Sequence, residues 1–156
     1  MIAFSSSREA QVQTQGMART TQPHASRLSV GLVSTQYLKD PLDAAWDNDA
    51  GMKDWKAFMA KYYPEGDLKD ASNVFGYTVA QGLVQVLKQC GDNLTRENVM
   101  RQAANLKDLQ LPLALPGIKV NTSPTDFAPF QQEQMVRFDG KQWVRFGEIM
   151  STSSGN

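Results

Sequence analysis

The chain has 156 residues, of which 41% are hydrophobic and 21% charged, and its 16 basic and 16 acidic side chains leave no formal net charge. This balance is ordinary for one globular domain, and it favours neither a nucleic-acid partner nor an acidic membrane surface. No apolar run approaches the roughly 18 residues of a membrane span, so none is expected. The single cysteine, Cys90, excludes an internal disulfide, and with the single histidine, His24, it argues against zinc; we predict no metal and no cofactor.

The first 27 residues differ in composition from the rest of the chain. They are rich in Ser, Thr and Gln, lack periodicity, and predict a disordered or unrelated N-terminal tail. Their apolar cluster, residues 1–4, is far shorter than the roughly 7–15 residues of the apolar region in a signal peptide. A second tail is predicted for residues 151–156, which leaves residues 28–150 as the folded part.

Residues 28–35, LSVGLVST, predict a β-strand. Successive side chains of a strand point to opposite faces, and apolar residues occur here on both. This favours a strand covered on both faces, as in a parallel sheet. Polar residues follow, and ligands of open α/β sheets bind beyond the carboxyl ends of the strands. Tyr37 is therefore a candidate ligand-binding residue, and a surface loop with a packed tyrosine is the alternative.

An acidic cluster precedes the first predicted helix, at Asp40, Asp43, Asp47 and Asp49. Its spacing does not fit a calcium loop, so helix capping and solvation are favoured over metal binding. Asp49 is predicted to cap a helix over residues 51–62. The face expected to meet the core has apolar and aromatic residues at helical spacing: Met52, Trp55, Phe58, Met59 and Tyr62.

The strongest helical pattern covers residues 73–91, NVFGYTVAQGLVQVLKQCG. Its periodic apolar positions predict one broad face of a central packing element: Val79, Ala80, Leu83, Val84 and Leu87. Gly76 and Tyr77 are predicted to mark the start of this helix, and Gly91 is predicted to end it as a C-cap. Cys90, beside that cap, is interpreted as a packed rather than a reactive cysteine.

The rest of the chain predicts a third helix and a small β region. Thr95 is a predicted N-cap, residues 109–116 (LQLPLALP) read as an extended apolar connector, and residues 117–120 predict a short strand. Asp139 and Gly140 form the preferred pair of a type I′ hairpin turn. A two-residue turn pairs Phe138 with Lys141 and Val136 with Trp143. The order of these elements is mixed α/β. One strand precedes the helices, and we expect the sheet partners of this strand to be missing.

Sequence motifs for catalysis are absent. The chain contains no phosphate loop, nucleophile elbow, HExxH or cysteine pair, and its carboxylates have no paired spacing. We therefore expect no catalytic residues and no enzyme. A small enzyme that depends on Asp40 or Asp43 is the alternative.

The order of these segments resembles the C-terminal part of the type I periplasmic solute-binding proteins, the leucine/isoleucine/valine-binding-like branch of ABC importers. The resemblance covers residues 28 to 150. It rests on the ordered set VGLVSTQYLKDPLDAAW, DWKAFMAKYYP, NVFGYTVAQGLVQVLKQCGDNLTRENVMRQAANL and LPGIKVNTSPTDFAPFQQEQMVRFDGKQWVRFGEI. It implies an α/β chain that is the C-terminal fragment of a two-lobed fold and ends in a β-hairpin.

The resemblance also implies a function. The chain would be part of the substrate-binding component of an importer for branched-chain amino acids or related small carboxylate or aromatic solutes, with an ABC permease as partner. Tyr37 and Tyr77 are implied to face the ligand cleft, and packing is the alternative for Tyr77. Such proteins are periplasmic, whereas this chain shows no signal peptide and would be cytoplasmic if made as written. The first lobe has no counterpart, so we expect a truncated chain, and a non-binding remnant or a protein-interaction module is the alternative function.

Overall fold

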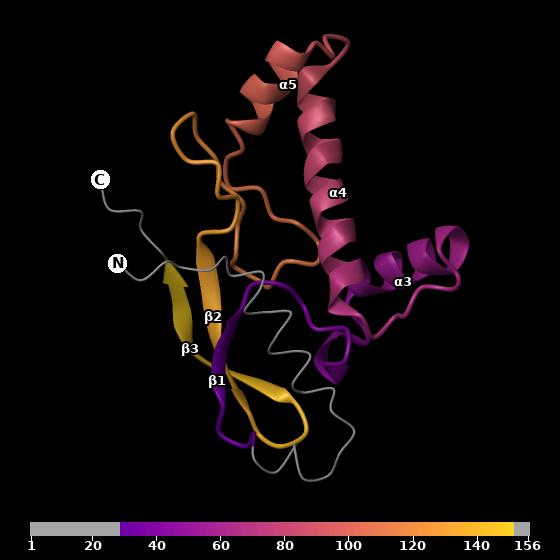
Figure 1. The fold of residues 1–156 in the computed structure, drawn as a ribbon, viewed down its shortest axis with the longest axis vertical. Coiled ribbons are helices and arrows are strands. Elements are labelled where there is room, and N and C mark those ends of the chain that lie inside the picture. The colour runs from indigo at the N-terminus through magenta and orange to yellow at the C-terminus, as the bar shows by residue number, and fades with distance from the viewer. Residues whose placement is uncertain (1–28, 152–156) are drawn as a thin grey trace.

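A computed structural model describes residues 29–151, and Figure 1 shows how their elements are arranged. In chain order these elements are β1 (Val33–Gln36), the 3-10 helix η1 (Ala44–Trp46), α3 (Ala50–Tyr62), α4 (Ala71–Cys90), α5 (Arg96–Ala103), β2 (Gln132–Phe138) and β3 (Trp143–Ser151). The predicted tail at residues 1–27 lies outside the described residues, as do residues 152–156. Ser151, predicted to begin the C-terminal tail, is the last residue of β3.

The three strands form one antiparallel sheet in the order β1-β2-β3. Val33 of β1 lies opposite Arg137 of β2. The prediction of a strand in a parallel sheet, covered on both faces, is therefore wrong, and Leu32 and Val33 remain 39% and 44% exposed. The expectation of missing sheet partners is also wrong, because the C-terminal hairpin supplies them from the far end of the chain.

The predicted hairpin forms, but its loop is longer than a two-residue turn. Phe138 pairs directly with Trp143, so residues 139–142 make the loop, and the predicted partners of Phe138 and of Val136 are wrong. The physical reason is the side chain of Asp139, which accepts hydrogen bonds from the backbone N–H groups of Lys141 and Gln142 and so stabilises a wider loop.

A small apolar cluster stabilises the hairpin. It comprises Val136, Phe138 and Trp143, and the ring centroids of the last two lie 5.4 Å apart. This cluster is separate from the main core, and the sheet also contacts the main core through Ile149 of β3.

Acidic residues cap the first two helices, as predicted. The Asp43 side chain accepts from the backbone N–H of Ala45 at the start of η1, and Asp49 accepts from that of Met52 at the start of α3. The predicted inner stripe of α3 is buried at Met52, Trp55 and Met59. Phe58 and Tyr62, predicted on the same face, are exposed.

The long helix α4 begins earlier than predicted. Asp70 is its N-cap, with a side chain that accepts from the backbone N–H of Ser72, so Gly76 and Tyr77 lie inside the helix and not at its start. The end is as predicted, because Gly91 follows Cys90 with a positive φ of 57°. Cys90 is buried, as expected for a packed cysteine.

Two opposite faces of α4 are apolar, and the predicted one is on the outside. The inner face buries Val74, Thr78, Val86 and Cys90. On the opposite face, Val79, Leu83, Val84 and Leu87 are 53%, 54%, 48% and 40% exposed. The prediction that this outer face packs into the core is therefore wrong in this chain, since the inner face makes those contacts.

The connector after α5 carries much of the main core. Thr95 caps α5 as predicted, and the chain then runs between the sheet and α4 (Figure 1). Leu111, Leu113 and Leu115 of the apolar connector are buried. Residues 117–120 do not form the predicted strand, because Val120 makes only isolated bridges, to Leu109 and to Phe130. Within residues 29–151, none of the helices has the length and apolar character needed to cross a bilayer.

Candidate functional site

A groove of about 460 Å³ lies between α4 and the connector. We call it the Tyr77 groove. Its lining residues are Phe58 of α3, then Tyr77, Ala80, Gln81, Val84, Gln85 and Lys88 of α4, and residues 109–112 of the connector. This volume lies within the range of small-molecule sites, which are mostly apolar with a few polar groups.

One end of the Tyr77 groove is aromatic and the remainder carries polar groups. The rings of Phe58 and Tyr77 contact each other, with centroids 5.0 Å apart. Gln81 has a buried Oε1 that finds no hydrogen-bond partner within residues 29–151. Such an acceptor is costly to leave unpaired, so a ligand N–H would find a favourable position there. Lys88, in the last turn of α4, supplies a positive charge.

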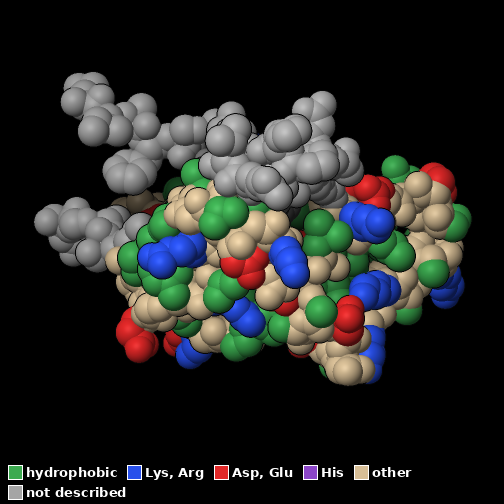
Figure 2. Space-filling model, turned by 90° about the horizontal axis from the view of Figure 1, so that it is seen from below, with side chains coloured by type: hydrophobic (Ala, Val, Ile, Leu, Met, Phe, Trp, Pro, Cys, Tyr) green, Lys and Arg blue, Asp and Glu red, His purple; other side chains and the backbone are tan. Residues whose placement is uncertain are grey.

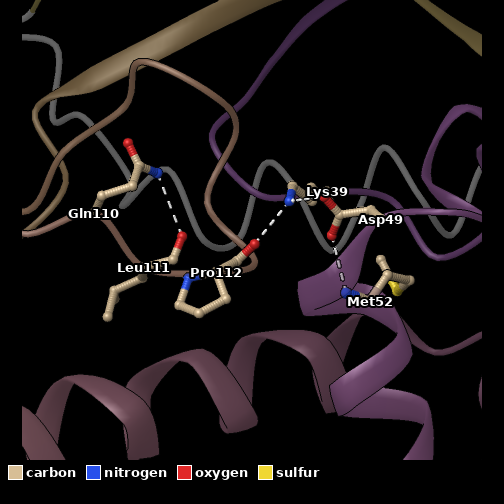
Figure 3. Close-up of polar contacts among 6 residues, drawn as sticks. All are labelled: Lys39, Asp49, Met52, Gln110, Leu111 and Pro112. Carbon is tan, nitrogen blue, oxygen red and sulfur yellow. Dashed lines mark hydrogen bonds and ion pairs between the residues drawn. The ribbon is translucent and has the colours of Figure 1, made fainter.

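The connector wall of the groove is held in place by Lys39 (Figure 3). Its Nζ donates to Oδ2 of Asp49 and to the carbonyl oxygen of Pro112, each at 2.7 Å. Gly51, in the first turn of α3, permits this close approach, since an added Cβ would lie 2.7 Å from the Pro112 oxygen. The side chain of Leu111 reaches α4 in turn, with Cδ1 4.0 Å from a Cβ added at Gly82.

The ion pair shifts the titration of Asp49. Burial alone would raise the pKa of this carboxyl group. The hydrogen bond from Lys39, the backbone N–H groups of Met52 and Gly51, and the charge of Lys39 outweigh burial and hold the pKa of Asp49 below its ordinary value. Asp49 is therefore ionised at neutral pH, both as helix cap and as partner of Lys39.

A second groove, of about 260 Å³, lies between the hairpin and residues 115–116. The polar side chains that line it already interact with other groups of the chain. Gln134 donates to the carbonyl oxygens of Phe146 and Gly147, and the guanidinium of Arg145 lies 4.4 Å from the ring centroid of Trp46. The Tyr77 groove is larger and holds an unsatisfied acceptor, so it is the better candidate site.

The structure does not bring the two predicted ligand residues to one groove. Tyr77 lines the Tyr77 groove, whereas Tyr37 lies in the main core, with its ring centroid 4.7 Å from that of Phe130, and lines neither groove. Sequence reasoning missed Gln81 and Lys88. The signal for them was present, because residues 77, 81, 84 and 88 recur at helical spacing on one side of α4.

The charged side chains suggest no additional site. On the face shown in Figure 2, basic and acidic side chains are interspersed and form no broad patch of one sign. Among residues 29–151, no three His, Cys, Asp or Glu side chains come together in a way that could hold a metal ion. Asp43, Asp49 and Asp70 act instead as helix caps.

Comparisons with known proteins give a relationship of fold. No family model matches the chain, and no curated protein matches it. Among solved structures, the chain is similar to a branched chain amino acid ABC transporter from Thermus thermophilus with bound valine, with a TM-score of 0.64 and 15% sequence identity. The match covers 83% of this chain and 35% of that chain. This chain therefore shares the fold of part of that protein and spans about a third of its length.

Proposed function

We propose that the chain forms part of a periplasmic solute-binding protein with a two-lobed fold, which serves an ABC importer. Its solutes are branched-chain amino acids or related small carboxylate or aromatic compounds, which it passes to a membrane permease without changing them chemically. The observation that carries the proposal is the fold shared with the Thermus thermophilus protein over 83% of this chain. That protein has valine bound, so valine is the first solute to test.

The Tyr77 groove offers what such a solute needs. Phe58, Tyr77 and Val84 supply aromatic and aliphatic surface for an apolar side chain. Lys88 supplies an ammonium group for the carboxylate, and the unpartnered Oε1 of Gln81 supplies an acceptor for an N–H group. In this proposal Tyr77 is a ligand-binding residue, while Tyr37 contributes through the packing of the core.

Isothermal titration calorimetry of the 156-residue chain with valine, leucine, phenylalanine and benzoate tests the proposal. We expect saturable heat from at least one of these solutes. Lys88→Met should weaken its binding about tenfold, the effect of losing one charge-assisted hydrogen bond. The matched control is Lys53→Met, which removes an exposed lysine of α3 that does not line the groove.

An analogue without the carboxylate separates the charge of Lys88 from its packing. Valinamide lacks the carboxylate and keeps the ammonium group, so Lys88→Met should not weaken its binding, whereas the same change should weaken the binding of valine. An equal loss for both solutes would contradict the assignment of Lys88. The absence of heat from every solute at millimolar concentration would contradict the binding function itself.

The alternative of a protein-interaction module has one specific observation in its favour. The outer face of α4 exposes Val79, Leu83, Val84 and Leu87, although its pattern is that of a packed surface. Monomeric proteins rarely expose contiguous apolar patches of this kind without a role. In this alternative, the exposed face of α4 therefore binds a partner.

A further inference from the structure

Two polar groups of the Tyr77 groove stand apart along α4. Gln81 and Lys88 both line the groove and differ by seven positions in the sequence. With a rise of roughly 1.5 Å per residue, their Cα atoms lie about 10.5 Å apart along the helix axis. The Lys88 ammonium group does not reach Gln81, because Oε1 of Gln81 has no hydrogen-bond partner within residues 29–151. The groove therefore offers an acceptor toward its aromatic end and a cation toward its other end.

The charge of the groove has one sign. Among its described lining residues Lys88 is the only charged one, and none of the ion pairs within residues 29–151 includes it. A solute carboxylate would therefore meet an unpaired cation. A solute ammonium group would meet no counter-ion from these residues and would be repelled by Lys88. In valine the ammonium group is bonded to the carbon that carries the carboxylate, so it cannot lie at Gln81 while the carboxylate lies at Lys88.

The walls of the groove suit a flat apolar body between these two groups. Val84 of α4 lies between them in the sequence, and the connector supplies the facing wall, with the Leu111 side chain pointing toward α4 (Figure 3). At the aromatic end, the ring centroids of Phe58 and Tyr77 lie 5.0 Å apart, and a third ring can pack on them edge-to-face or offset-stacked. An aromatic solute also holds its two ends at a fixed separation and loses little conformational freedom on binding.

We infer that the Tyr77 groove selects an aromatic carboxylate that carries a neutral hydrogen-bond donor at the opposite end of its ring, as in para-hydroxyphenylacetate, over an α-amino acid. Lys88 binds the carboxylate, and the buried Oε1 of Gln81 accepts from the hydroxyl group. Gln81 is thereby the specificity-determining residue, because a solute without the donor leaves this acceptor unpaired. The inference rests on the proposed function, since it names the class of solute that the same groove binds.

Isothermal titration calorimetry of the full chain with three solutes tests the inference. Para-hydroxyphenylacetate carries both groups, para-fluorophenylacetate has nearly the same shape without the donor, and valine carries an ammonium group beside its carboxylate. We expect the tightest binding for para-hydroxyphenylacetate. Each of the other two should bind about tenfold more weakly, the effect of one lost hydrogen bond or of one charge without a counter-ion.

The outcomes separate this inference from the proposed function. Equal affinities for the hydroxyl and fluoro compounds would overturn the assignment of Gln81 and with it the inference. Tighter binding of valine than of para-hydroxyphenylacetate would also overturn the inference. In both cases the chain binds a solute, so the proposed function would stand. The absence of heat from all three compounds and from the solutes named above would contradict the proposed function and the inference together.

A variant of Gln81 tests the acceptor directly. Gln81→Met keeps much of the length and apolar volume of the side chain but removes Oε1. It should weaken the binding of para-hydroxyphenylacetate about tenfold and leave that of para-fluorophenylacetate unchanged, which also shows that the variant retains its groove. The matched control is Gln89→Met, which should alter neither affinity, because Gln89 is an exposed residue of α4 that does not line the groove.

The same variant distinguishes hydrogen bonding from packing. An equal loss for both compounds, in a variant that keeps the circular dichroism of the native chain, would mean that Gln81 acts through packing and would overturn its assignment. The comparison of the three solutes on the native chain does not depend on this variant, so it decides the inference where Gln81→Met does not fold.

Discussion

Lys39 and Pro112 are 73 positions apart in the sequence, yet Nζ of Lys39 donates a 2.7 Å hydrogen bond to the carbonyl oxygen of Pro112. The same ammonium group donates to Asp49, also at 2.7 Å. One cation thus joins the segment after β1, the start of α3 and the connector wall of the Tyr77 groove (Figure 3). Because the Lys39 side chain is only 7% exposed, solvent and salt screen these interactions little.

Replacing Lys39 should destabilise the fold. Lys39→Met keeps much of the aliphatic stem but removes the donor from the Pro112 carbonyl and the counter-ion from Asp49. We expect the free energy of unfolding in urea to fall by about 2 kcal/mol, less than for a fully buried pair because water reaches Asp49. Lys53→Met, at an exposed position of α3, should change it by less than about 0.5 kcal/mol. Equal losses in the two variants would show that Lys39 does not hold the three segments together.

The lowered pKa of Asp49 predicts an acid-dependent loss of stability. Its pKa in the folded chain lies below its value in the unfolded chain, so the charged carboxylate stabilises the fold at and above the unfolded value of about 3.9. This contribution is lost as the pH falls through the folded pKa. Asp49→Asn retains a helix cap but not the charge. The difference in unfolding free energy between the native chain and this variant should therefore be constant from about pH 5 to 8 and shrink below about pH 4. A difference that stays constant down to pH 2 would contradict the assignment.

Asp139 should stabilise the hairpin loop through its side chain. The backbone N–H groups of Gln142 and Lys141 donate to its carboxylate and lower its pKa. Asp139→Ala removes the Oδ1 atom that accepts both hydrogen bonds and should lower the melting temperature. Asp139→Asn retains an oxygen at that position without the negative charge, so its hydrogen bonds are weaker and its melting temperature should fall between those of the native chain and the alanine variant. If all three chains melt at the same temperature, these hydrogen bonds do not contribute to the loop.

The parts of the fold that depend on neighbouring residues were predictable. The caps Asp49 and Thr95 and the glycine after α4 act within a turn of their own helices, and each is found where the sequence places it. The parts that depend on distant residues were not. β1 pairs with a strand from the other end of the chain, and no local alternation reveals whether that partner is parallel.

Of the residues that line the Tyr77 groove, only Tyr77 was expected to bind a ligand, and its ligand binding stays a prediction. The family resemblance indicated Tyr77, which lines the Tyr77 groove, and Tyr37, which packs against Phe130. The contribution of Lys39 could not be foreseen, because a lysine after a strand is usually solvated and its partner Pro112 is remote in sequence. The periodicity of α4 was detected, but periodicity does not say which of two apolar faces the rest of the chain covers.

Two glycines beside the connector should respond oppositely to alanine. At Gly51, a Cβ would lie 2.7 Å from the carbonyl oxygen of Pro112 and 2.8 Å from its Cβ. Both atoms belong to the connector, which the hydrogen bond from Lys39 holds in place. Gly51→Ala should therefore destabilise the chain by about 1–3 kcal/mol despite the better helix propensity of alanine. At Gly82 of α4, the nearest contact is Leu111 Cδ1 at 4.0 Å, so alanine fits and should stabilise the chain by up to about 1 kcal/mol. Urea unfolding followed by circular dichroism measures both changes. Stabilisation by both alanines would mean that the connector does not lie against the start of α3.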